Sequence, residues 1–120
     1  MVKGCGLSNN RFDGVMVTTS STSVTETRCV ANNNGIHAQS GSANIVERNH
    51  VLNNVANGVQ IDSSVCFVYG NLARGNPTNY SIVAGNRVGQ IVVAATNAAA
   101  ISGNSGGVAV TTDPYCNIAF

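Results

Sequence analysis

A short unit that recurs along the chain is the feature that most limits how this sequence can fold. The unit reads IVERN at residues 45–49, FVYGN at 67–71 and IVAGN at 82–86, with a looser copy, VTETR, at 24–28. In chain order the copies begin at residues 24, 45, 67 and 82, so the steps between them are 21, 22 and 15 residues. A unit of this size is too small to bury its own apolar face, so the sequence predicts units stacked on one continuous core.

A second short segment follows a glycine in the earlier units and alternates apolar with other residues. These segments are GVMV at 14–17, GIHA at 35–38 and GVQI at 58–61. Such alternation is typical of a strand with one buried face. We expect one buried column of Val15, Ile36 and Val59, a second of Val17, Ala38 and Ile61, and an outward column of Met16, His37 and Gln60. The glycines are expected to adopt a positive φ, because Asp or Asn precedes each of them, as in many turns.

No stretch predicts a helix, because Asn, Gly, Ser and Thr interrupt the apolar runs and β-branched residues dominate between them. Two or three short strands per repeat, returning in the same order, indicate a coil whose rungs pair in parallel about 4.8 Å apart. Asparagines that stack in such a coil can hydrogen-bond amide to amide. The expected ladders are Arg28, Asn49, Asn71 and Asn86 in one column and Asn33, Asn54 and Asn76 in another.

Two sets of residues resemble a known group of proteins. They are the units at 44–49, 66–71 and 81–86, and the Asn-Gly-Ile and Asn-Gly-Val strand starts at 34–36 and 57–59. Together they resemble the right-handed parallel β-helix repeat proteins, the pectin-lyase-like superfamily. The resemblance covers about residues 8–90, and the tail at 100–120 is similar to the C-terminal end of bacterial members. It implies an all-β chain folded as a single-stranded right-handed parallel β-helix, or solenoid.

The expected domain has about four short rungs over residues 1–90 and a C-terminal cap over 91–120. We expect cap strands at 90–94 and 107–110 to fold back over the open end, as terminal repeats of a solenoid must. No comparable cap precedes the first rung. We therefore expect either a fragment of a longer coil or a homo-oligomer that pairs through this uncapped N-terminal rung.

The composition argues against two classes of partner. Charged residues make up only 9% of the chain, and the net charge is +1. The six Lys and Arg residues are scattered singly, so we expect no nucleic-acid partner. No apolar run has the length of a signal peptide or of a membrane helix, roughly 18 residues. This predicts a soluble chain with no membrane partner and leaves its localisation unassigned.

The cysteines, Cys5, Cys29, Cys66 and Cys116, show none of the spacings of a zinc site, so no metal centre is expected. The sequence leaves both buried free thiols and disulfides open. If the segment after Cys5 repeats the segment after Cys29, the two sulfurs would stack on adjacent rungs within reach of a disulfide.

Glu26 and Glu47 are the best candidates for chemistry. The repeat places them in one outward column on successive rungs, with Tyr69 next and with Arg28 and Arg48 close by. Two carboxylates about 5 Å apart can share a proton, hold a cation such as Ca²⁺ or act on a glycosidic bond. The resemblance implies a similar use, because superfamily members that cleave uronic-acid polymers employ carboxylates and a basic residue on such an outer face. Their catalytic segments, such as Asn-Thr-Asp or Arg-Ile-Lys, are absent from this chain.

We therefore expect a non-catalytic structural or binding module, without a cofactor, whose outer face contacts polysaccharide. Tyr69, His37 and Gln60 are the expected ligand contacts, because their positions face outward. The alternative is a polysaccharide lyase or glycoside hydrolase, or the remnant of one, that uses Glu26 and Glu47. In that case Arg28 and Arg48 would assist, and the carboxylates could hold Ca²⁺.

Overall fold

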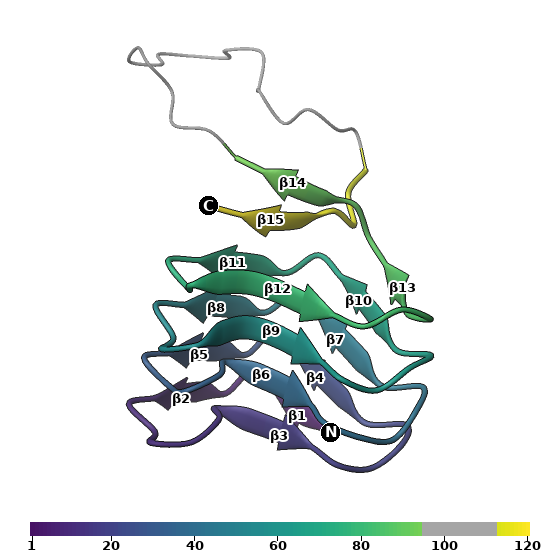
Figure 1. The fold of residues 1–120 in the computed structure, drawn as a ribbon, viewed down its shortest axis with the longest axis horizontal. Helices are drawn as coiled ribbons and strands as arrows, with labels where there is room; N and C mark the ends of the chain where they lie inside the picture. Colours follow the sequence, from purple (N-terminus) through teal and green to yellow (C-terminus); the bar gives the residue numbers. More distant parts are fainter. Residues whose placement is uncertain (95–112) are drawn as a thin grey trace.

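The computed structural model describes residues 1–94 and 113–120 and winds them into a parallel β-solenoid of about five turns (Figure 1). Three parallel sheets form its sides, and no helix occurs within these residues. The predicted all-β parallel coil is therefore confirmed. Across the same residues no helix is available that is long and apolar enough to cross a membrane.

Each sheet collects short strands from successive rungs. Sheet A contains β1 (Val2–Lys3), β4 (Ser23–Thr25), β7 (Ile45–Glu47), β10 (Phe67–Tyr69) and β13 (Arg87–Val88). Sheet B contains β2 (Gly6–Ser8), β5 (Arg28–Val30), β8 (His50–Leu52), β11 (Leu72–Arg74), β15 (Asn117–Ala119) and β14 (Ile91–Val93). Sheet C contains β3 (Val15–Val17), β6 (Ile36–Ala38), β9 (Asn57–Ile61) and β12 (Thr78–Ile82).

The coil has about five turns where the sequence predicted about four rungs. The additional length comes from its two ends. Val2 in β1 pairs with Val24, and Arg87 in β13 pairs with Phe67. Neither β1 nor β13 carries a full copy of the repeated unit, so the pattern could not reveal them.

Small side chains fill the narrow interior. Fully buried stacks comprise Val24, Val46 and Val68 in sheet A and Cys29, Val51 and Ala73 in sheet B. In sheet C the register confirms both predicted columns, since Val15 pairs with Ile36 and Ile36 with Val59. Complete burial of one valine contributes about 1.5–3 kcal/mol. The rungs therefore stabilise one another through a shared core that no single unit possesses.

The glycines that open the sheet C strands are required for a different reason from the one predicted. Gly14, Gly35 and Gly58 do not adopt a positive φ. A Cβ atom on each would lie 2.6–2.8 Å from a backbone carbonyl oxygen of the neighbouring rung. Steric exclusion by the adjacent rung, rather than a turn conformation, therefore selects glycine.

Two asparagine ladders run along the corners of the coil. One contains Thr27, Asn49, Asn71 and Asn117, and the other contains Asn10, Asn32, Asn54 and Asn76. In both ladders a backbone N–H donates to the side-chain oxygen on the next rung, as in the 3.1 Å bond from Asn49 N to Asn71 Oδ1. These bonds satisfy buried polar groups where the chain bends. Stacked asparagines were predicted, and this is confirmed.

Three expected ladder members were wrong. Arg28 is exposed and pairs with His50 in sheet B. Asn33 is exposed beside Asn32, which takes the ladder position. Asn86 lies at a different corner, where its side-chain oxygen accepts the backbone N–H of Cys66 at 2.8 Å.

Two predicted alignments of the repeated unit were also wrong. Thr25, and not Glu26, pairs with Glu47, so the two glutamates do not share a column. The sequence alignment paired Glu26 with Glu47 because both are glutamates, and this shifted the 24–28 segment by one position from its true register. Ile82 pairs with Ile61 in sheet C, so the 82–86 segment is not a structural copy of 67–71.

The C-terminal strand is inserted into the coil. β15 lies between β11 and β14 in sheet B and runs parallel to both (Figure 1). The strand predicted at 90–94 corresponds to β14, whereas the one predicted at 107–110 lies outside the described residues. All four cysteines are free, and Leu7, rather than Cys5, pairs with Cys29. The conditional Cys5–Cys29 stack is therefore wrong.

Candidate functional site

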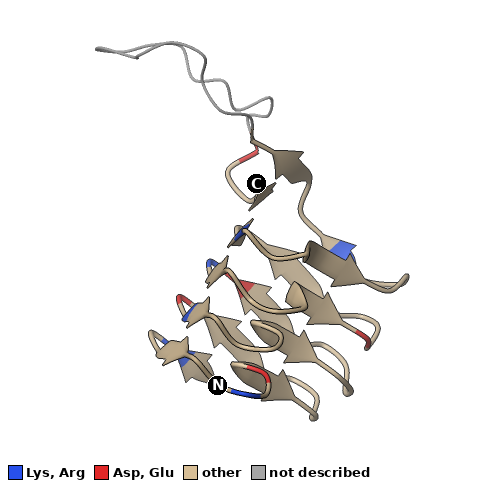
Figure 2. Cartoon of the chain, turned by 60° about the vertical axis from the view of Figure 1, so that its left-hand side comes forward, with Lys and Arg blue, Asp and Glu red and all other residues tan. Residues whose placement is uncertain are grey.

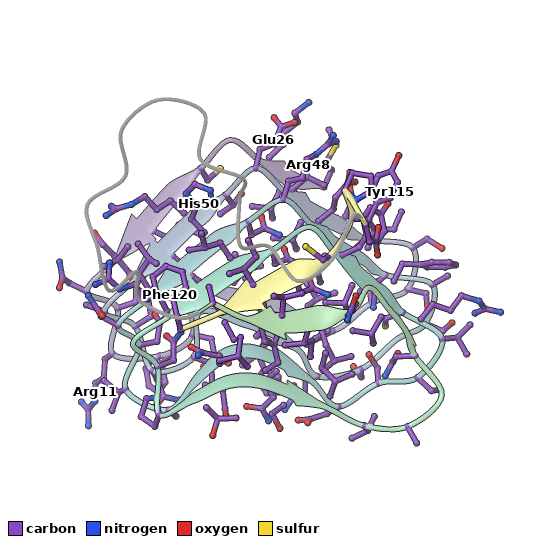
Figure 3. All side chains as sticks on the ribbon, turned by 90° about the horizontal axis from the view of Figure 1, so that it is seen from above. Arg11, Glu26, Arg48, His50, Tyr115 and Phe120 are labelled. Atoms are coloured by element: carbon purple, nitrogen blue, oxygen red, sulfur yellow. The ribbon has the colours of Figure 1, made fainter. Side chains whose placement is uncertain are left out.

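The corner between sheets A and B gathers several of the side chains selected from the sequence. We define this A–B corner as Gly4, Glu26, Arg48, Gly70 and Tyr115. The first four each follow a sheet A strand and have positive φ values, 52° for Glu26 and 51° for Arg48. The Gly70 N–H donates to the Tyr115 carbonyl oxygen at 2.9 Å, which extends the corner to the C-terminal segment. Glu26, Arg48 and Tyr115 project from the same side of the coil (Figure 3).

An ion-pair network links this corner to the outer face of sheet A. The Arg48 guanidinium lies 2.9 Å from Glu47 Oε1 and 3.9 Å from Glu26 Oε1. Lys3 Nζ lies 3.6 Å from the other oxygen of Glu26. The structure thus brings Glu26, Glu47 and Arg48 together as expected, but the arginine connects the carboxylates. Charged residues on the coil lie mainly at corners and strand ends (Figure 2).

Tyr69 stands next to Glu47 in sheet A and donates its hydroxyl to Glu47 Oε2 at 3.3 Å. Burial raises the pKa of the Tyr69 hydroxyl, and the negative charge and hydrogen bond of Glu47 raise it further. The phenol therefore stays protonated at neutral pH and acts as a donor. Its ring contacts that of Tyr115 edge to face, with 6.0 Å between centroids and 86° between planes.

A shallow hollow of about 490 Å³ lies beside these rings, and we call it the aromatic hollow. It is lined by Phe67, Tyr69, Arg87, Val88, Gly89 and Tyr115. The Arg87 guanidinium lies 5.3 Å from the centre of the Phe67 ring, in the range of a cation–π contact. Gly89 admits the C-terminal segment, because a Cβ there would strike the Tyr115 carbonyl oxygen. The hollow therefore combines three aromatic rings with one positive charge.

A second hollow, of about 280 Å³, lies on the sheet B side of the same corner. It is lined by Glu26, Thr27, Arg28, Arg48 and His50, and we call it the basic pocket. Arg28 and His50 occupy paired positions on the adjacent strands β5 and β8. The pocket therefore holds Arg28 near Arg48, as the sequence predicted.

The outer face of sheet C carries a different arrangement, which we call the histidine clasp: Asp13, His37 and Asp62. His37 Nδ1 lies 2.8 Å from Asp13 Oδ2, and Nε2 lies 2.9 Å from Asp62 Oδ2. His37 is in the outward column, yet only 8% of it is exposed. Gln60 donates to Asp62 at 2.8 Å. Both imidazole nitrogens are engaged, so the geometry favours a structural role over proton transfer to a ligand.

Asp13 is the most strongly held carboxylate of the clasp. Its side chain is 6% exposed, and burial by itself would raise its pKa. Hydrogen bonds from His37 and Asn34, together with the charge of His37, outweigh burial and lower the pKa of Asp13 below its ordinary value of 3.8. Asp13 therefore remains ionised across the physiological range.

Sequence reasoning missed Phe67 and Arg87, and it did not place Tyr115 beside Tyr69. The strand alternation contained a signal for Phe67, which shares the outward side of β10 with Tyr69. Arg87 was hidden by the incorrect alignment of the 82–86 segment. Nothing in the repeat indicated that Tyr115, near the end of the chain, would reach this surface.

Among the described residues, no group of three or more His, Cys, Asp or Glu side chains is arranged to hold a metal ion. Comparison of the chain with protein-family models, curated proteins and solved structures finds no match.

Proposed function

We propose that this chain is a non-catalytic binding module that holds polysaccharide in the aromatic hollow and along the A–B corner. The resemblance of its repeats to the pectin-lyase-like superfamily supports a sugar polymer as the ligand, since members of that group bind such polymers on an outer face of the coil. No cofactor enters the proposal.

The observation that carries this proposal is the composition of the aromatic hollow. Aromatic rings offer flat apolar surfaces to the C–H faces of sugars, and polar groups at the edge can bind hydroxyl or carboxylate oxygens. Tyr69 and Tyr115 supply two rings at nearly a right angle, and Arg87 supplies the charge. A volume of about 490 Å³ lies within the ordinary range for ligand pockets.

The state of Glu47 favours binding over cleavage. One of its carboxylate oxygens is paired with Arg48 at 2.9 Å, and the other accepts the Tyr69 hydroxyl at 3.3 Å. Glu26 is likewise shared between Lys3 and Arg48. A carboxylate engaged on both oxygens is poorly placed to attack a sugar or to abstract a proton.

Isothermal titration against a panel of neutral and uronate-containing polysaccharides tests this proposal. Tyr115 is 61% exposed and Phe12 is 75% exposed, so truncating either ring should leave the fold intact. We expect Tyr115→Ala to weaken binding about fivefold to tenfold, and Phe12→Ala, outside the hollow, to leave it unchanged. Equal effects of both variants, or no binding by the unaltered chain, would overturn the proposal.

The rival activity is depolymerisation of an anionic glycan through Glu26 and Glu47. The observation in its favour is that Arg48 brings both carboxylates onto one surface. Release of reducing ends or of unsaturated sugars, measured with and without Ca²⁺, discriminates the two functions. Turnover that Glu47→Gln abolishes would establish the enzyme and refute the non-catalytic module.

We also propose that copies of the chain associate through the first rung. β1, β2 and β3 are the edge strands of their sheets at the same end of the coil, so each leaves one row of backbone groups unpaired among the described residues. Such parallel edges template further strands. Light scattering should show a molar mass that rises with concentration, and a constant monomer mass would refute the association.

A further inference from the structure

The basic pocket holds two side chains that the structure leaves uncommitted. Arg28 and His50 are both exposed, and no side-chain hydrogen bond or ion pair involves either of them in the part of the chain described. Their strands place them one above the other on the outer face of sheet B. Figure 3 shows His50 on the same side of the coil as Glu26 and Arg48.

The charges around the pocket leave an excess of positive charge. Lys3, Arg28 and Arg48 face the carboxylates of Glu26 and Glu47. Glu26, the one acid that lines the pocket, is already compensated by Lys3 at 3.6 Å and Arg48 at 3.9 Å. The positive charge of Arg28 is therefore available to an anion, and the imidazole ring of His50 offers a further N–H donor.

Thr27 is the buried residue of the pocket lining, and hydrogen bonds hold both its backbone and its side chain. Thr27 is 1% exposed, its hydroxyl donates to the Thr25 carbonyl at 3.1 Å, and its N–H donates to Asn49 Oδ1 at 2.9 Å. These bonds fix the backbone between Glu26 and Arg28. Glu26 and Arg28 flank Thr27 in the chain, so the bond from Thr27 to Asn49 of the ladder helps to position both of them.

We propose that the basic pocket binds the tetrahedral oxyanion of a sulfate or phosphate ester. Arg28 and His50 lie on neighbouring rungs and Arg48 lines the same pocket, so donors from two successive rungs surround one hollow. A tetrahedral ester presents three terminal oxygens, whereas a carboxylate presents two in one plane. A volume of about 280 Å³ also leaves room for the organic group that carries the anion. The basic pocket shares Glu26 and Arg48 with the A–B corner but no residue with the aromatic hollow, and binding of an oxyanion there does not require a glycan in the hollow.

The two histidines of the chain provide the assay. In carbon–proton NMR spectra of the full chain, held at fixed pH and ionic strength with chloride, the His50 ring signals should shift saturably on addition of phenyl phosphate or phenyl sulfate. The His37 ring is clasped on sheet C and serves as the internal control. Comparing the two esters with inorganic phosphate, inorganic sulfate and acetate identifies which oxyanion, free or esterified, the pocket prefers.

Substitutions complete the test. We expect Arg28→Gln to weaken ester binding about tenfold and Arg11→Gln, which lies at a different corner of the coil from Glu26 and Arg48 in Figure 3 and does not line the pocket, to leave it unchanged. Binding that both variants retain, a response equal to that of acetate, or the absence of any saturable shift at His50 would overturn the proposal. Loss of glycan binding at the aromatic hollow would not affect this result, so the two proposals fail independently.

Discussion

His37 Nε2 lies 2.9 Å from Oδ2 of Asp62 on the next rung of sheet C, and this contact ties together two strands that already pair through their backbones. With Asp13 on the other nitrogen, the ring spans three rungs on the outside of the coil. The clasp therefore acts alongside the buried core in holding the rungs in register.

Removal of the clasp should destabilise the coil. We expect His37→Ala to lower the free energy of unfolding by about 2–3 kcal/mol, because it leaves the nearly buried Asp13 without its principal partner. Urea denaturation followed by circular dichroism measures this. Met16→Ala, an exposed position in the same column, is the matched control, and equal losses from both variants would contradict a specific role for the ring.

Asp13 should make the fold sensitive to acid. Its pKa is lowered in the folded state, so its contribution is fully present above the unfolded value, near 3.8, and is lost as the pH falls through the folded value. We expect stability to decline below about pH 4, and Asp13→Asn to reduce the slope of stability against pH in that range. Thermal denaturation between neutral and acidic pH tests this, and identical slopes for the two proteins would refute it.

Asn32 and Asn33 are adjacent in the chain, but only Asn32 belongs to the buried ladder. Asn32 is fully buried and bonds to Asn10, Asn54 and the Leu7 carbonyl, whereas Asn33 is exposed. We expect Asn32→Ala to cost about 2–4 kcal/mol, since it leaves several buried polar groups without partners. Asn33→Ala should cost less than about 0.5 kcal/mol. Chemical denaturation of the two variants measures the difference, and a larger cost at Asn33 would mean that the ladder register is wrong.

The cysteines should differ in reactivity. Burial, with a smaller effect from the charge of Cys5, raises the pKa of Cys29 to about 12, while Cys5 is exposed. We expect iodoacetamide to alkylate Cys5 in the native protein at neutral pH and Cys29 only after unfolding. Peptide mass spectrometry gives the modified positions, and rapid native labelling of Cys29 would contradict the burial of this column.

The sequence predicted sheet C more accurately than sheets A and B. Its strands begin with glycines and alternate cleanly, so Val15, Ile36 and Val59 aligned without ambiguity. At the A–B corner the true register depends on which residues adopt a left-handed backbone and on Thr27 occupying a ladder position. Residue types do not display either fact, so Glu26 was matched to Glu47 by likeness alone.

The candidate sites were less predictable because they join distant segments. The sequence predicted that Glu26, Glu47 and Arg48 lie close together, because Glu47 and Arg48 are adjacent in the chain and Glu26 lies one rung away. The aromatic hollow depends on the contact between Tyr115 and Tyr69 of β10. Tyr115 lies outside the repeated units, so the repeat pattern could not predict this contact. His37 was expected to be open to ligand, but its two carboxylate partners come from other rungs and cover it.

The position of β15 between β11 and β14 has a consequence for biosynthesis. Asn71 donates to Asn117, and Gly75 donates to the carbonyl oxygen of Phe120, so the upper side of β11 is completed only by residues 117–120. β14 precedes β15 in the chain but reaches β11 only through it. During synthesis the earlier rungs can therefore pair before residues 117–120 have left the ribosome, whereas the upper part of sheet B can form only after them.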